Sequence, residues 1–217
     1  MLNWDFFSVQ NTAFSILNYP VSYLELIGVI TGYTTVLMAT KMHKFFWWIS
    51  FINVLAFAYL FYQIQLYADA FLQIYYLGIT VYGLIQWYQS SAENLIKPKQ
   101  LNTSQWINIV AFSITLWLIS YYIFSNLNHW LPLIFPLPTS FVILETLILT
   151  LSIIANWLLA ERYKENWIFW LLVNIMAVYV YYQKEIYFTC LQYFIFGLMA
   201  VYGYLEWQKA EQQVSDH

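Results

Sequence analysis

The segment from Leu66 to Tyr88 reads LYADAFLQIYYLGITVYGLIQWY and carries one formal charge, Asp69, near its start. A helix of ~20 apolar residues spans ~30 Å, the thickness of the hydrocarbon core of a bilayer. At about 100° per residue, one face of this helix carries an amide, a phenol, a hydroxyl, a glycine and an indole. These side chains belong to Gln73, Tyr76, Thr80, Gly83 and Trp87. The segment therefore predicts a membrane-spanning helix with one polar and aromatic wall.

The composition of the whole chain points to the same environment. Of its 217 residues, 62% are hydrophobic and only 9% are charged, whereas soluble domains are nearer 25% charged. Lipid is therefore the expected solvent for most of the chain. The net charge of −3 gives no reason to expect a nucleic-acid partner, and the single cysteine, Cys190, excludes an internal disulfide. We expect no cofactor and no metal site.

Apolar segments follow an N-terminal stretch that is too polar to span a bilayer. We predict seven spans, at Val21–Thr40, Phe45–Tyr62, Leu66–Tyr88, Trp106–Phe124, Phe141–Ala160, Asn166–Tyr182 and Ile186–Trp207. Before them, residues 1–18 carry a stripe of apolar side chains, formed by Leu2, Phe6, Val9, Ala13 and Leu17. Such a stripe predicts an interfacial amphipathic helix. The expected fold class is therefore an all-α integral membrane protein with an N-terminal interfacial helix.

The positive charges predict the orientation of the chain. If there are seven spans, one face of the membrane receives almost all of the cations, namely Lys41, Lys44, Lys97, Lys99, Arg162, Lys164 and Lys209. The opposite face receives Lys184 alone. Because cytoplasmic loops carry the excess of lysine and arginine, the N-terminus is predicted to lie outside and the C-terminus in the cytoplasm.

An internal repeat divides the chain. The motif VYG-x-x-x-W at residues 81–87 recurs at 201–207, and the same 120-residue offset pairs Lys44 with Lys164 and Trp47 with Trp167. We predict a first three-helix bundle at 21–90, a linker helix at 104–125 and a second three-helix bundle at 140–208. This 3+1+3 arrangement implies parallel repeats related by an axis along the membrane normal. The copies differ, since Thr189 replaces Asp69 and Glu206 replaces Gln86.

The run LYADA-x-LQ that leads into YG-x-x-x-W, together with its degenerate copy near the C-terminus, resembles the nicotinamide riboside transporter family (PnuC). The resemblance extends from about Val21 to Trp207, and this family is similar in helix arrangement to the SWEET sugar transporters. It implies facilitated diffusion of nicotinamide riboside, a vitamin B3 nucleoside used in NAD biosynthesis, across a bacterial inner membrane. It also implies trapping by a cytoplasmic nicotinamide riboside kinase and assembly as a homotrimer. Members also serve thiamine, riboflavin and deoxynucleosides, so these substrates remain alternatives.

Polar side chains inside spans are costly unless they face protein or water, so each is a candidate to line a substrate site. We predict a site made of amides and aromatic rings, at Trp47, Asn53, Gln73, Tyr76, Thr80, Gln86, Trp87, Trp167, Trp170, Asn174, Tyr181, Gln192, Glu206 and Trp207. Amides can donate to and accept from ribose hydroxyls. Indole faces attract a cationic ring by roughly 0.5–2 kcal/mol. The predicted spans carry no lysine or arginine, so a phosphorylated substrate is predicted to be rejected.

Each of these residues also has a structural alternative. Amides inside spans often hold neighbouring helices together, and tryptophans near span ends often anchor the chain at the membrane surface. The glycines at 28, 32, 83 and 203 are expected to allow close helix packing. The sequence contains no H-E-x-x-H or G-x-S-x-G motif and no phosphate-binding loop, so we expect no enzymatic activity. A receptor or scaffold that transports nothing remains the alternative from another functional class.

Overall fold

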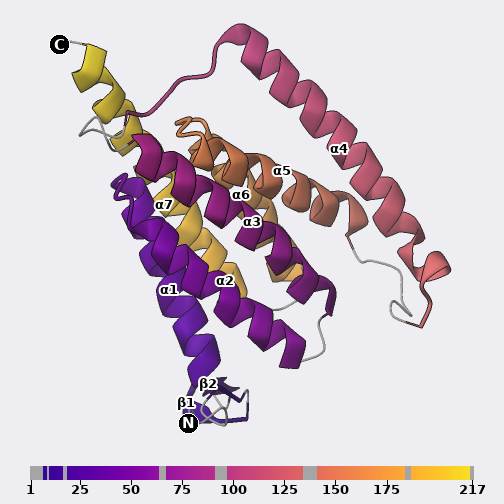
Figure 1. Ribbon diagram of the computed structural model, residues 1–217. Coiled ribbons are helices and arrows are strands. Elements are labelled where there is room, and N and C mark those ends of the chain that lie inside the picture. The colour runs from indigo at the N-terminus through magenta and orange to yellow at the C-terminus, as the bar shows by residue number, and fades with distance from the viewer. Residues whose placement is uncertain are drawn as a thin grey trace. The chain divides into compact units, whose positions relative to one another are not determined.

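The structure is a computed structural model that describes residues 7–8, 10–16, 19–63, 67–90, 97–133, 141–183 and 187–215. Within these ranges it contains seven α-helices and one two-stranded sheet, as the ribbon shows (Figure 1). The chain separates into two compact units, residues 1–96 and residues 97–217, and each is described by itself. The predicted seven-helix, membrane-type fold class is confirmed at this level.

The first unit consists of a β-hairpin and three helices. Its elements are β1 (Thr12–Ile16), β2 (Tyr19–Ser22), α1 (Tyr23–Thr40), α2 (Phe46–Gln63) and α3 (Tyr67–Ser90). Helix α2 packs against both α1 and α3. Helix α1 begins where the backbone N–H of Glu25 donates to Ser22 Oγ over 3.1 Å, which satisfies one of the free donors of the first turn.

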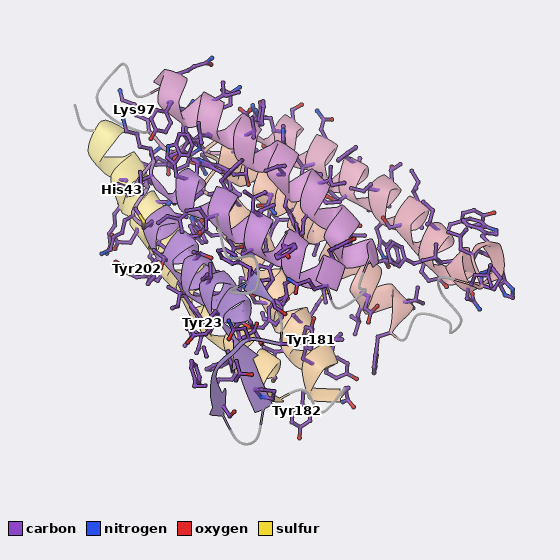
Figure 2. The ribbon with its side chains drawn as sticks, turned by 60° about the horizontal axis from the view of Figure 1, so that its bottom comes forward. Tyr23, His43, Lys97, Tyr181, Tyr182 and Tyr202 are labelled. Carbon is purple, nitrogen blue, oxygen red and sulfur yellow. The ribbon has the colours of Figure 1, made fainter. Side chains whose placement is uncertain are left out.

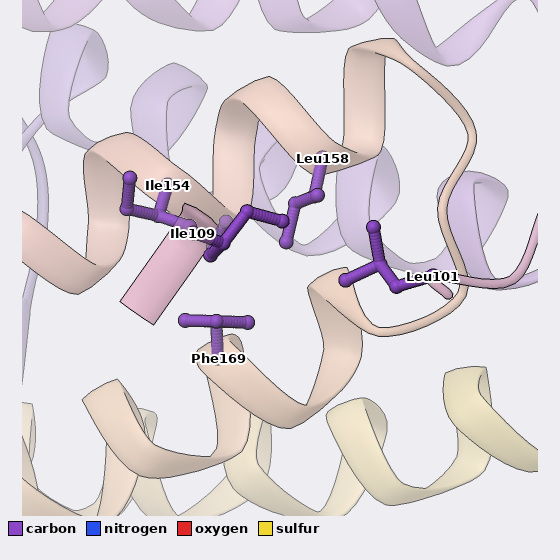
Figure 3. Close-up of a cluster of buried hydrophobic side chains, with 6 residues drawn as sticks. Leu101, Ile109, Ile154, Leu158 and Phe169 are labelled. Atoms are coloured by element: carbon purple, nitrogen blue, oxygen red, sulfur yellow. The ribbon is translucent and has the colours of Figure 1, made fainter. Parts of the chain in front are cut away.

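The second unit contains four helices. They are α4 (Thr103–Trp130), α5 (Val142–Ala160), α6 (Asn166–Gln183) and α7 (Tyr187–Ser215), and each packs against the next along the chain. Helix α4 begins with a capping box in which Asn102 and Gln105 each accept a backbone N–H of the other over 2.9 Å. Figure 3 shows the buried cluster that joins α4, α5 and α6, including Leu101, Ile109, Ile154, Leu158 and Phe169.

Most helix boundaries lie within two residues of the predicted spans, but α4 and α7 are longer. Helix α4 ends at Trp130 and α7 ends at Ser215, whereas the spans were predicted to end at Phe124 and Trp207. The extra segment after Trp207, about two helical turns long, is polar, so hydropathy alone could not count it as part of a span. It continues as helix because it contains strong helix formers such as Lys209, Ala210 and Glu211.

The N-terminal segment differs from its prediction. Residues Thr12–Ile16 form β1 rather than part of an amphipathic helix, and they pair with β2 in an antiparallel hairpin. The alternation Thr-Ala-Phe-Ser-Ile also fits a strand, and pairing with the chain directly before α1 satisfies backbone groups that an isolated helical turn would leave free. Residues 1–6, 9, 17 and 18 of the predicted helix lie outside the described residues.

The turns after α1 and α5 have the same backbone structure. Met42 and Arg162 both adopt a left-handed conformation, with φ of 53° and 67°, as helix C-termini commonly do. In each turn the following residue donates its backbone N–H to the carbonyl five residues back, over 3.0 Å and 2.8 Å respectively. The two positive-φ residues are separated by the same 120 positions as the sequence motif. The repeat therefore extends to local structure.

Candidate functional site

A tryptophan packs against a glycine in the first unit. Trp47 is 2% exposed, and a Cβ built on Gly83 would lie 2.2 Å from its ring. Trp87, one turn after Gly83 on α3, meets the Trp47 ring edge-on with centroids 6.1 Å apart and an interplanar angle of 76°. Only glycine at position 83 lets α2 and α3 approach this closely.

The second unit repeats the arrangement at the matching positions. Trp167 is 3% exposed, and a Cβ on Gly203 would lie 2.6 Å from its ring. Trp207 meets Trp167 edge-on at 5.9 Å and 83°. The close-packing role expected of Gly83 and Gly203 agrees with this geometry. Four of the five predicted site tryptophans, at 47, 87, 167 and 207, therefore pack between helices of their own units.

The indole nitrogens of Trp47 and Trp167 share an unusual state. Both N–H groups are buried and have no hydrogen-bond partner in the described part of the chain. An unmade hydrogen bond of a buried donor costs about 1–3 kcal/mol.

Two predicted site residues join helices of the first unit. Asn53 Nδ2 donates to the Gly28 carbonyl over 2.7 Å and to Thr31 Oγ1 over 3.0 Å, which links α2 to α1. Thr80 Oγ1 lies 3.3 Å from Ser50 Oγ, which links α3 to α2. Both Nδ2 hydrogens of Asn53 are thereby used, so this amide serves helix packing, the alternative considered for every amide in a span.

The other predicted residues on α3 have separate surroundings. Gln73 is buried, Tyr76 lies against the Tyr75 ring with centroids 5.5 Å apart, and Gln86 Nε2 donates to the Tyr82 hydroxyl one turn earlier over 3.2 Å. That Gln73 and Tyr76 line a substrate site stays a prediction. This hydrogen bond holds the Gln86 side chain against the surface of α3.

Aromatic rings and an amide come together on α6 and α7. Tyr181, labelled in Figure 2, stacks on Tyr193 with centroids 5.2 Å apart and planes at 13°. Phe196 meets Tyr193 edge-on at 6.4 Å. Asn174 is 4% exposed, and its Cβ lies 3.6 Å from the point where a Cβ of Gly197 would be. Tyr193 was not among the predicted site residues, although its spacing from Phe196 places both on one face of α7.

The remaining predicted residues of this unit are less closely grouped. Gln192 is half-buried on α7, and Trp170 is partly buried against the cluster of Figure 3. Glu206 pairs with Lys209 over 3.0 Å on the exposed side of α7. Lys209 is the one lysine or arginine in the seven helices. We call the group formed by Asn174, Tyr181, Tyr193 and Phe196 the α6–α7 wall; it contains no charged side chain, and it can offer ring faces and an amide to a ligand.

Helices α1, α4 and α5 are long and apolar enough to cross a membrane, and large apolar side chains such as Ile107 and Phe112 of α4 are exposed. These features define an α-helical membrane protein. The chain belongs to the nicotinamide mononucleotide transporter family, whose sequence model matches residues 22–209.

Relatives and a solved structure resemble nearly the whole chain. It is 29% identical to the nicotinamide riboside transporter PnuC of Escherichia coli over 229 aligned positions, which cover 94% of both proteins. It is also 29% identical to PnuC of Neisseria mucosa, over 88% of this chain and 73% of the relative. The crystal structure of the vitamin B3 transporter PnuC is similar with a TM-score of 0.68 and 25% identity, over 88% of this chain and 83% of that one.

Proposed function

We propose that this protein takes up nicotinamide riboside across a bacterial inner membrane by facilitated diffusion with alternating access. A cytoplasmic nicotinamide riboside kinase would trap the substrate and link uptake to NAD biosynthesis. Family membership and the names of the relatives support this substrate.

The observation that carries the proposal is the uncharged wall of α6 and α7. The Tyr181–Tyr193 stack supplies ring faces beside the buried Asn174 amide. A pyridinium ring gains from aromatic faces, and ribose hydroxyls and a carboxamide need groups that both donate and accept. We propose that Asn174, Tyr181 and Gln192 of the second unit contact the substrate.

The same wall favours the riboside over the mononucleotide. A phosphate is usually held by arginine or lysine in charge-assisted hydrogen bonds. Lys209 is the only lysine or arginine in the seven helices, and it is exposed and paired with Glu206. A phosphorylated substrate would therefore lose its hydration without gaining a cation, and we expect it to be rejected.

Counterflow in proteoliposomes tests the proposal. Vesicles are loaded with unlabelled nicotinamide riboside and diluted into labelled nicotinamide riboside, with protein-free vesicles as the control. We expect labelled substrate to accumulate transiently, unlabelled riboside to compete and the mononucleotide not to compete. Absence of exchange would favour the receptor or scaffold. Stronger exchange of thiamine would keep transport and change the substrate.

Coupling to ions is tested in the same vesicles. In the described part of the chain, no three His, Cys, Asp or Glu side chains gather where they could hold a metal ion, and facilitated diffusion needs no coupling ion. We expect uptake into kinase-free vesicles to be unchanged when ionophores remove proton and sodium gradients. Loss of uptake under these conditions would contradict facilitated diffusion.

We also propose that α1–α3 and α5–α7 are parallel repeats joined by α4, with the N-terminus outside and the C-terminus in the cytoplasm. The 120-residue offset of sequence and turn geometry supports the repeat, and the segregation of cations supports the orientation. Cysteines introduced at Lys184 and Lys209, with Cys190 replaced by alanine, would be labelled from outside and inside respectively. Native mass spectrometry would test the expected homotrimer.

A further inference from the structure

The turn between α5 and α6, residues 161–165, is held on one side by the end of α7. The Lys164 ammonium forms an ion pair with the Glu211 carboxylate, and the Lys164 side chain is only 6% exposed. A buried ammonium is stable only when it is paired. Separating Lys164 from Glu211 would therefore leave a charge without a partner inside the protein.

Residues 99–105 hold the other side of this turn. Two backbone hydrogen bonds join Lys99 to the turn, from Lys99 N–H to Arg162 O (2.8 Å) and from Lys164 N–H to Lys99 O (3.0 Å). Two further hydrogen bonds involve side chains: Leu101 N–H donates to Glu165 Oε1 (3.2 Å), and Gln105 Nε2 donates to Tyr163 OH (2.9 Å). Lys99 Nζ also lies 3.5 Å from Glu161 Oε2. We call these contacts, together with the Lys164–Glu211 pair, the inner clamp.

The matching turn of the first unit, residues 41–45, has a different environment. Its Lys41, His43 and Lys44 side chains are exposed, and Phe45 is 50% exposed. The Lys44 ammonium lies 5.0 Å from the centre of the Tyr88 ring, and both side chains are exposed, whereas the Lys164–Glu211 pair is largely buried.

The sequence explains this difference. At the 120-residue offset, Glu161, Glu165 and Glu211 correspond to Lys41, Phe45 and Ser91, so the three carboxylates of the inner clamp have no counterpart in the first copy. Trp48 Nε1 instead donates to the Tyr88 hydroxyl over 3.0 Å at the surface. Two turns of the same backbone geometry are thus fixed to very different degrees.

We propose that the inner clamp keeps the α5–α6 turn fixed while the α1–α2 turn moves during transport. The two repeats would then contribute unequally to opening, with the second unit as the static partner. The movement of the α1–α2 turn with substrate rests on the proposed transport function. The fixed α5–α6 turn rests on contacts within each unit.

Hydrogen exchange measured by mass spectrometry on the full chain in lipid nanodiscs tests both halves. Without substrate, we expect backbone amides of residues 42–49 to exchange faster than those of 162–169. Saturating nicotinamide riboside should change exchange in 42–49 and leave 162–169 unchanged. Equal basal rates, or a substrate-dependent change in 162–169 as large as that in 42–49, would overturn the inference.

Variants test whether the ion pair is responsible. Glu211→Gln leaves Lys164 buried without its charge partner, and we expect roughly tenfold faster exchange in 162–169, because breaking a partly buried pair costs at least the ~1.4 kcal/mol that a factor of ten represents. Lys209→Gln is the matched control, since it removes an exposed pair on the same helix, and it should leave exchange in 162–169 unchanged. No effect of Glu211→Gln would overturn the role of the pair.

A double variant covers the case in which Glu211→Gln does not fold. Lys164→Met with Glu211→Leu replaces the pair by apolar side chains, and we expect it to restore slow exchange in 162–169. Fast exchange in the double variant would contradict the clamp. Counterflow is measured on every sample, and its absence from the wild type would overturn the proposed function. In that case the basal hydrogen-exchange rates would still show whether the two turns differ in how firmly they are held.

Discussion

Alanine at Gly83 places a methyl group in space that the Trp47 ring occupies. The added Cβ would lie 2.2 Å from two atoms of that ring, whereas carbon atoms in contact are normally 3.5–4.0 Å apart. Gly78 provides a matched control on the same helix, because a Cβ there meets nothing within 4 Å.

The magnitude follows from two opposing effects. Replacing a glycine inside a helix by alanine stabilises the helix by up to ~1 kcal/mol. Forcing a methylene-sized group into a packed site costs about 1–3 kcal/mol. We therefore expect Gly83→Ala to lower the free energy of unfolding by about 1–2 kcal/mol, since Trp47 is packed against Phe46 and Trp87 and has no free volume to enter. Gly78→Ala should leave it unchanged or raise it slightly.

Thermal unfolding in detergent, followed by intrinsic fluorescence, measures the difference. For a protein of this size, 1 kcal/mol corresponds to ~2–4 °C, so Gly83→Ala should unfold roughly 2–8 °C below the wild type. Adding Trp47→Phe removes the part of the ring that clashes, and the pair should show a favourable coupling energy of about 1 kcal/mol in a double-mutant cycle. Equal unfolding temperatures for Gly83→Ala and Gly78→Ala, or strictly additive effects of the two changes, would refute the packing argument.

Three further predictions concern amides and a buried carboxyl. Asn174→Ala should weaken nicotinamide riboside binding, measured by tryptophan fluorescence titration, about tenfold for the loss of one or two buried hydrogen bonds; unchanged affinity would remove Asn174 from the site. Asn53→Ala should instead lower the unfolding temperature, since it removes two interhelical bonds worth ~0.6 kcal/mol each, and should leave affinity unchanged; a normal unfolding temperature would contradict its packing role. Burial raises the pKa of Glu165, which lies in the turn before α6. As pH rises from the ordinary glutamate pKa through the raised value, the carboxyl ionises more readily in the unfolded chain than in the folded one. The free energy of unfolding therefore falls over this pH range. Glu165→Gln keeps an acceptor for Leu101 N–H and should be more stable than the wild type at pH 7.5, with the gap closing as pH falls toward the ordinary value; a gap independent of pH would refute this.

Periodicity and hydropathy predicted the helices well because the physical cause is local. Each span needs enough consecutive apolar residues, and the starts of α1 and α4 are marked by the capping residues Ser22 and Asn102. Where the cause is not local, the prediction was wrong: Thr12–Ile16 pairs with β2 as a strand, although its apolar stripe also fits a helix. Backbone pairing between segments decided that case.

The candidate site shows the same difference between what local sequence predicts and what contacts between helices decide. Asn53 and Asn174 look alike in sequence, since both are amides within apolar spans. The structure shows Asn53 bonded to α1 and Asn174 buried beside Gly197. The tryptophans at 47, 87, 167 and 207 were predicted to contact substrate, and they pack against glycines or one another. Nothing along one helix specifies which neighbour its side chain meets.

The sequence by itself determined the membrane class, the seven helices, the 120-residue repeat and the family. These depend on composition, on periods of a few residues and on matching motifs, all of which can be read from the order of residues along the chain. Only the tertiary structure decided which polar groups join helices, which rings stack, and that the turn after α5 is clamped whereas its counterpart after α1 is exposed. Those outcomes depend on contacts between residues distant in sequence, such as Lys164 with Glu211 and Leu101 with Glu165, and their energies exist only once the helices have packed.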